Sequence, residues 1–143
     1  MSSEDLRLET QRRLSQASDD LLAAQVLRDA GHHALAAFHA QQSAEKALKG
    51  LWRSLDLEPW GHSAVKLLED LPEAPAGLDL ETMLPLAAAL DKLYIPTRYP
   101  DALPGLTPAE AYTRDEADTA IRQARSLVDS VREAVMQGRN PAA

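Results

Sequence analysis

Residues 31–51 read GHHALAAFHAQQSAEKALKGL, and this stretch decides the fold. It lacks proline, and Pro59 stands beyond the end of the helix that it predicts over residues 33–55. Gly31 ends a preceding helix, because a residue without Cβ enters the left-handed conformation at low cost. The short connection makes the two helices antiparallel. The apolar residues expected on the inward side of the second helix are Leu35, Phe38, Leu48, Leu51 and Trp52.

The rest of the chain also reads as helices. Leucine and alanine recur at helical spacing over residues 3–30 and 114–137, and Ser63 can cap a short helix that ends at Leu71. A further helix is expected over residues 79–94, with Pro85 inside it, so that it begins nearer Thr82 or bends. Four prolines between residues 96 and 108 predict a fixed loop. The predicted fold class is all-α, an antiparallel helical bundle of four to five helices.

The composition limits the classes of function. A length of 143 residues fits a single domain, 1–143, with its core at about 3–137. The net charge of −7 argues against unspecific binding to duplex DNA. The absence of cysteine excludes disulfides and thiolate metal sites. The acidic N-terminus and the lack of a run of about 20 apolar residues predict a cytoplasmic location and no membrane span.

A stripe of polar and aromatic side chains lies on the helix over residues 33–55. At 100° per residue, its members fall within about 40° of one line. In one interpretation, Glu45 and Lys49 form an ordinary i to i+4 pair on the surface. In the other, the polar groups are half-buried and need fixed partners, which indicates an interface or a binding site. The stripe consists of Phe38, Gln42, Glu45, Lys49 and Trp52.

The second informative segment is YIPTRYPD, residues 94–101. Pro96 and Pro100 restrict the backbone and hold Arg98 in a limited set of directions. A guanidinium held in this way suits a phosphate or a carboxylate, and Tyr99 offers a ring on which a base can stack. The alternative is that Arg98 pairs with Asp101 or Glu110 and only fixes the loop.

These segments resemble the HEPN family. Residues 31–51 are similar to its central helix, with the pattern Ala-x-Phe-x-x-Gln-Gln-x-x-Glu-Lys-Ala-Leu-Lys, and YIPTRYPDA at residues 94–102 resembles its Arg-Tyr-Pro-Asp loop. Gly61, His62 and Ser63 resemble the histidine segment between them, and the similarity runs from about Leu14 to Val135. The resemblance implies a helical bundle, frequent dimerisation, nucleotide binding, and pairing with minimal nucleotidyltransferase proteins in toxin–antitoxin-like modules.

The leading hypothesis is therefore a binding module that engages a nucleotide or RNA. It works as a homodimer, because the first and last predicted helices carry more small apolar positions than one bundle of this size needs. No cofactor is expected. The candidate nucleotide- and phosphate-binding residues are Gln42, Glu45, Lys46, Lys49, Arg98, Tyr99 and Asp101.

An enzymatic function is the runner-up hypothesis. Many HEPN proteins are metal-independent endoribonucleases with an Arg-x(4–6)-His motif at the start of the last helix. In this sequence no histidine follows Arg98 or Arg114, and all four histidines, at positions 32, 33, 39 and 62, precede them. An endoribonuclease would therefore need an atypical site in which Arg98 binds the phosphate and His62 acts as acid or base. A metal site at the first three histidines is not expected, and a purely structural subunit is the third possibility.

Overall fold

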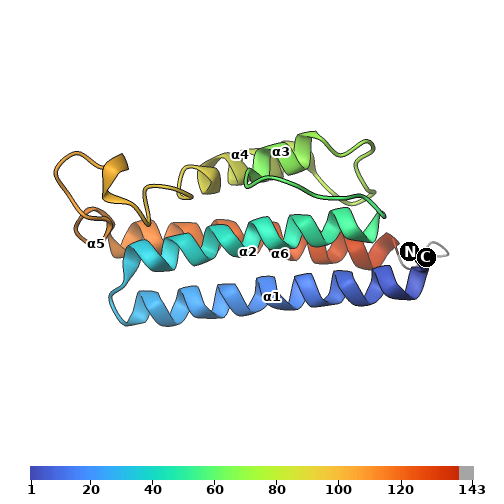
Figure 1. Cartoon of the computed structure of the whole chain (residues 1–143), viewed down its shortest axis with the longest axis horizontal. Coiled ribbons are helices and arrows are strands. Elements are labelled where there is room, and N and C mark those ends of the chain that lie inside the picture. Colours follow the sequence, from blue (N-terminus) through green and yellow to red (C-terminus); the bar gives the residue numbers. More distant parts are fainter. Residues whose placement is uncertain (139–143) are drawn as a thin grey trace.

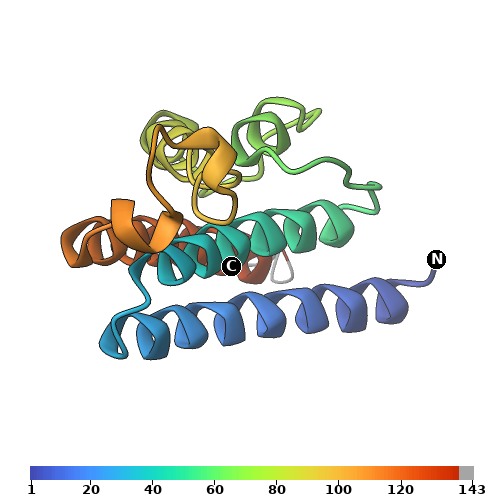
Figure 2. The ribbon, with the colours of Figure 1, turned by 60° about the vertical axis from the view of Figure 1, so that its left-hand side comes forward.

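The computed structural model describes residues 1–138 as a bundle of α-helices in three layers (Figure 1). The helices α1 (Ser3–Asp29), α2 (His33–Ser54) and α6 (Arg114–Gly138) are long and pack against one another. The shorter helices α3 (Ala64–Glu69) and α4 (Leu80–Asp91) form a layer on the side of α2 and α6 opposite α1 (Figures 1 and 2). The predicted all-α antiparallel bundle is confirmed.

Local signals in the sequence explain where the helices begin and end. Side-chain oxygens of Ser2, Ser63 and Asp79 accept hydrogen bonds from the first-turn amides of α1, α3 and α4. Gly31 has a φ of +87°, so the chain reverses there and α2 returns along α1. Helix α4 begins at Leu80 and continues past Pro85, rather than beginning near Thr82.

The segment after α4 differs from its prediction. Helix α4 ends at Asp91, three residues before its predicted end, and the chain continues through a series of turns. The predicted fixed loop over residues 96–108 contains a 3-10 turn, η1 (Pro100–Ala102), and leads into a one-turn helix, α5 (Pro108–Ala111). Thr107 and Glu110 form a reciprocal capping box on α5. The proline count indicated a break in the long helices, whereas this short helix depends on a local cap.

Small residues on α2 set the distance between the long helices. Its core faces carry five alanines with no solvent exposure, and these faces pack against α1 and α6. A Cβ added at Gly50 would lie 3.3 Å from the Cβ of Arg13 and 3.5 Å from a methyl carbon of Leu14, so the helices approach closely there. The alanines are Ala36, Ala37, Ala40, Ala44 and Ala47.

Larger apolar side chains fill the core on both sides of this alanine face. One hydrophobic cluster draws residues from α1, α2, α3, α4 and α6, including Leu48, Leu51, Leu90 and Leu127. The prediction that Leu35 points inward is wrong, because its exposed fraction is 43%. Within residues 1–138, no helix is both long and apolar enough to cross a membrane.

Replacement of Ala44 by leucine tests the importance of the small residues on α2. The extra side-chain volume cannot fit between the close-packed helices, so Ala44→Leu should lower the free energy of unfolding by about 1–3 kcal/mol. Urea unfolding followed by circular dichroism measures this change. Ala88→Leu, the same substitution at an exposed position of α4, is the control and should have little effect. Equal stability of the two variants would contradict the proposed tight packing.

Candidate functional site

The side chain of Arg98 lies among three aromatic rings. We call Arg98 and these three rings the arginine cage. The guanidinium carbon of Arg98 is 4.5 Å from the ring centre of Phe38, 4.5 Å from that of Tyr94 and 4.9 Å from that of Tyr99. Its Nε donates a hydrogen bond of 3.0 Å to the carbonyl oxygen of Tyr94. These contacts hold the guanidinium by its faces and one edge, and they leave its two terminal nitrogens for another acceptor.

The turn after α4 positions Arg98 over α2. The amides of Arg98 and Tyr99 both donate to the carbonyl oxygen of Ile95, and the Thr97 hydroxyl donates to the carbonyl oxygen of Leu93. Thr97 is only 1% exposed, so this turn is packed against the bundle. The backbone restraint predicted from the flanking prolines is therefore supplemented by hydrogen bonds within the turn.

The alternative in which Arg98 pairs with a nearby carboxylate is not observed. Across residues 1–138, Arg98 forms no ion pair with Asp101 or with Glu110. Glu110 instead accepts hydrogen bonds from the amide and hydroxyl of Thr107, and these bonds lower the pKa of Glu110. The Glu110 carboxylate is thus kept in its charged form, and its hydrogen bonds go to the cap of α5 rather than to Arg98.

A pocket of about 290 Å³ adjoins Arg98 at the N-terminal end of α2. Its lining includes His32, His33, Thr97, Arg98 and Pro108. The side chain of the N-cap residue, His32, makes no capping hydrogen bond, so the pocket lies beside backbone N–H groups that lack partners within the helix. A guanidinium together with the N-terminus of a 22-residue helix favours a negatively charged group in this pocket.

The polar residues of the predicted stripe form a second group, the Glu45 cluster. Glu45 is 3% exposed, and its carboxylate accepts a hydrogen bond of 2.8 Å from Gln42 Nε2. His62 Nδ1 lies 2.8 Å from Glu45 Oε1, and Lys49 Nζ lies 3.6 Å from the same oxygen. The i to i+4 pair therefore exists, but it belongs to a buried network that includes a residue from outside the helix. Of the two interpretations of the stripe, the structure supports the one in which Gln42, Glu45 and Lys49 are buried or half-buried and have fixed partners.

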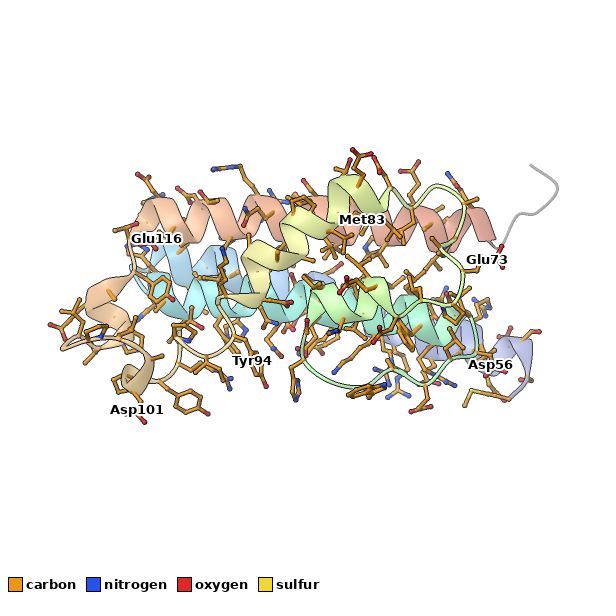
Figure 3. The ribbon with its side chains drawn as sticks, turned by 90° about the horizontal axis from the view of Figure 1, so that it is seen from above. Asp56, Glu73, Met83, Tyr94, Asp101 and Glu116 are labelled. Atoms are coloured by element: carbon orange, nitrogen blue, oxygen red, sulfur yellow. The ribbon has the colours of Figure 1, made fainter. Side chains whose placement is uncertain are left out.

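The Glu45 cluster and the arginine cage meet at Tyr94. The His62 ring stacks on the Tyr94 ring with centres 5.0 Å apart and an angle of 15° between their planes. Figure 3 shows Tyr94 on the long side of the molecule along which the connection between α2 and α3 runs. The fold thus brings His62 and Arg98, 36 positions apart in the sequence, into contact with the same ring.

Two of the predicted binding residues lie apart from this arrangement. Lys46 turns toward α1, where its Nζ is 2.6 Å from Asp20 Oδ2. Asp101 is exposed on η1, at the end of the loop (Figure 3). Within residues 1–138, His32, His33 and His39 belong to no group of three or more potential metal ligands.

Tyr94 is the residue that the sequence interpretation missed. In the sequence it is only the first residue of the arginine segment, whereas in the structure it contacts both halves of the site. Its position four residues before Arg98 was an available signal, because side chains with this spacing meet within a helical turn. The stacking of His62 on Tyr94 had no comparable signal, since it depends on the path of the connection between α2 and α3.

Comparisons with known proteins give a consistent result. The family model described as "HEPN domain" matches residues 10–134. The crystal structure of TT1696 from Thermus thermophilus is similar, with 44% identity, 88% of this chain and 98% of that chain covered, and a TM-score of 0.83. The crystal structure of ST0689, an archaeal HEPN homologue, is also similar, with 36% identity and a TM-score of 0.73. The match covers 89% of this chain and 98% of that chain. "Putative toxin MJ1304" of Methanocaldococcus jannaschii is 23% identical over 138 residues, with 84% of each chain covered.

Replacement of Glu45 by alanine tests the energetic role of its cluster. Glu45→Ala removes a buried charged acceptor and leaves Gln42 and Lys49 without it, so we expect a loss of about 1.5–3 kcal/mol in the free energy of unfolding. Chemical denaturation provides the measurement. Glu133→Ala, at an exposed position of α6, should change stability by less than about 0.5 kcal/mol. A Glu45→Ala protein as stable as the Glu133→Ala control would show that the network contributes nothing to stability.

Proposed function

Because the chain belongs to the HEPN family, we propose that it is a helical binding module that holds a phosphate of a nucleotide or RNA at Arg98. The observation that carries this proposal is the state of the Arg98 side chain. Its faces lie on aromatic rings and its Nε is hydrogen-bonded, but it has no carboxylate partner within residues 1–138. A half-buried cation of this kind favours an anionic ligand, since unpaired charge is costly to bury.

Other half-buried or buried arginines differ from Arg98 because their terminal nitrogens have partners within the protein. The half-buried Arg132 also lacks a carboxylate partner, but it donates to the carbonyl oxygen of Leu14 and the hydroxyl of Ser18. Arg28 lies 3.2 Å from a carboxylate oxygen of Asp118, and the Arg53 Nε lies 3.2 Å from one of Glu9. Their charges are therefore already compensated within the protein. With a net charge of −7, the exterior repels a long polyanion, so binding has to be local. Arg98 and the pocket at the start of α2 provide such a local site.

One observation favours an endoribonuclease as the second candidate function. His62 and Arg98 contact the same Tyr94 ring, and the buried Glu45 carboxylate holds His62 by its Nδ1. A carboxylate that orients a histidine leaves the other ring nitrogen, Nε2, to exchange a proton. The His62 side chain is 61% exposed, so a substrate can reach it. Such an enzyme would cleave mixed RNA in the presence of EDTA and would lose this activity on Arg98→Ala, whereas a binding module does not cleave.

The proposed partner is a minimal nucleotidyltransferase protein in a toxin–antitoxin-like module. The similarity to a protein named "Putative toxin MJ1304" supports the module, and the HEPN resemblance supports the class of partner. A cytoplasmic location is part of the same proposal. An adjacent gene for a small nucleotidyltransferase and copurification of the two proteins would test it directly.

A homodimer is also proposed, but on a different basis from the one predicted. The small residues of α1 and α6, such as Ala17, Ala24 and Ala124, are buried within the chain and are not available for a second copy. Helix α1 instead exposes Leu22 by 59% and Val26 by 67%, one turn apart on its outer face. We propose that a second copy of the chain covers this face, because an isologous contact would bury both pairs at once.

The binding proposal predicts a specific loss of affinity in Arg98→Ala. Removal of the charged hydrogen-bond donor should weaken binding of adenosine monophosphate or a short single-stranded RNA by about 1.5–3 kcal/mol, with helical content unchanged. Arg98→Lys should restore only part of the affinity, because lysine lacks the planar group that stacks in the cage. Isothermal calorimetry measures both effects.

The matched control is Arg125→Ala, which removes an exposed arginine from α6 and should leave binding unchanged. Unchanged affinity in a folded Arg98→Ala protein would contradict the proposal. Equal loss of folding and binding would assign Arg98 a structural role instead.

The dimer proposal predicts a species of about twice 15.6 kDa at micromolar concentration. Leu22→Asp should shift this species to the monomer, because it places a charge in the proposed apolar contact. Analytical ultracentrifugation distinguishes the two states. Leu106→Asp changes another exposed leucine, in the loop before α5, and should leave the dimer intact. Sedimentation as a monomer by the unmodified protein would refute the dimer.

A further inference from the structure

Trp60 is the most exposed large aromatic residue described for this chain, with an exposed fraction of 75%. It lies in the connection between α2 and α3. The ring of the preceding residue, Pro59, fixes the φ angle of that proline, and the following residue, Gly61, adopts a φ of +86°. Single exposed apolar residues are common, but Pro59 restricts the backbone directly before Trp60, so less backbone freedom is lost when a ligand covers the indole. Its position is therefore suited to stacking.

A pocket of about 390 Å³ opens beside the Trp60 ring. Its wall includes Trp52, whose indole N–H is already donated to the carbonyl oxygen of Leu67 at 2.8 Å. Trp52 therefore contributes apolar surface and no free polar group. We call this space the Trp60 pocket, and the lining residues that matter here are Trp52, Trp60, His62, Lys66, Leu67 and Asp70.

We propose that the Trp60 pocket binds an unpaired nucleobase, with the base stacked on the Trp60 indole. This inference rests on the proposed function, because it supplies a base subsite for the ligand whose phosphate Arg98 holds. A pocket with aromatic walls and few polar groups is typical of sites for flat ligands, and aromatic stacking accepts any base because every base has a π face.

The polar groups at the pocket favour a base over a purely apolar group. The side chains of Lys66 and Asp70 line the pocket, and neither forms an ion pair within residues 1–138. Lys66 can donate hydrogen bonds and Asp70 can accept them, which matches the mixed donors and acceptors on the edge of a base.

The Trp60 pocket is connected to the arginine cage through two rings. His62 lines the pocket, and its ring stacks on Tyr94, which also contacts the Arg98 guanidinium at 4.5 Å. Lys49, a further cation, lies near the Glu45 oxygen that His62 contacts. The Trp60 pocket reaches α2 at Trp52, whereas Arg98 contacts it at Phe38, about 21 Å away along the helix axis. A single strand of several nucleotides can therefore span both, and Lys49 and Lys66 are the nearer cations for a mononucleotide.

Trp60 suits the base better than Tyr99, which the sequence indicated as the stacking residue. The Tyr99 ring is already in contact with Arg98, at 4.9 Å from the guanidinium carbon to the ring centre. Trp60 makes no such ring or cation contact among the described residues, so its indole is available to a ligand. Tyr99 is accordingly assigned to the arginine cage.

The test uses the full chain with three probes, namely adenosine monophosphate, ribose 5-phosphate and a single-stranded hexaadenylate RNA. The sequence has two tryptophans, and Trp52 is only 8% exposed, so a change in the emission of exposed tryptophan reports on Trp60. Adenosine monophosphate or the RNA should change this emission, and ribose 5-phosphate should not. Trp60→Ala should reduce the affinity for the RNA, for adenosine monophosphate or for both about tenfold or more, equivalent to about 1.4 kcal/mol. Calorimetry measures this change.

Two variants serve as controls. Trp60→Phe should retain most of the affinity, because phenylalanine preserves a stacking face. Leu55→Ala removes another exposed apolar side chain from the same connection, outside the Trp60 pocket, and should have no effect. If Trp60→Ala weakens binding of both adenosine monophosphate and the RNA, the subsite is open to free nucleotides. If it weakens binding of the RNA alone, the subsite takes a base of a single strand.

Other outcomes would overturn the inference. Binding that depends on Arg98 but is unchanged in Trp60→Ala would leave the proposed function intact and refute the base subsite. A change in sedimentation of Trp60→Ala without a change in affinity would assign Trp60 to a protein interface. No binding of the nucleotide or the RNA by the unmodified protein would refute the proposed function, and the base subsite with it.

Discussion

The close packing of α1 and α6 against the alanine faces of α2 is the constraint on which the rest of the structure depends. Side chains of one methyl group allow the long helices to approach, and at Gly50 even a methyl group would meet Arg13. Helix α2 is thereby surrounded by α1, α6 and the layer of α3 and α4. The polar side chains of α2 therefore lie in the strip between α1 and the layer of α3 and α4. The same geometry that builds the core therefore gathers the polar residues of α2 along one line.

Burial of Glu45 is a direct consequence of this arrangement. A carboxylate that is 3% exposed needs partners, and two come from its own helix, namely Gln42 and Lys49. The third partner, His62, comes from the connection before α3. Meeting the hydrogen-bonding needs of one buried group thus fixes the path of a distant segment. Through His62 this network also reaches Tyr94, and so the ring that supports Arg98.

The electrostatics of the chain combine an acidic whole with a local cation. Its net charge of −7 would repel extended nucleic acid, whereas Arg98 is held on aromatic rings without a neighbouring carboxylate among the described residues. Aromatic faces attract a guanidinium through their quadrupole without neutralising its charge. This difference matters for binding, because an ion pair with Asp101 or Glu110 would have competed with an external anion. His62 lines the Trp60 pocket and stacks on Tyr94, the ring that also contacts Arg98. The pocket and this cation therefore lie on the same side of the fold.

The sequence by itself determined the long helices and the family. Spacing of apolar residues, caps such as Ser63 and the stop at Gly31 act over a few residues, so they are readable in one dimension. The segments 31–51 and 94–102 likewise carry the HEPN resemblance in their order of residues. The position of Glu45 between Phe38 and Trp52 on one face of a helix made its burial one of two interpretations, and the structure decided between them.

Only the tertiary structure decided which residues share a site. It showed that Lys46 pairs with Asp20 on α1, whereas Lys49 lies beside Glu45. It also joined His62 to Arg98 through Tyr94 and left Asp101 outside. Such contacts depend on the paths of connections that contain no periodic signal, and they are set by which buried groups must find partners. For that reason the helices of this protein could be derived from its sequence, whereas the arginine cage and the Trp60 pocket could not.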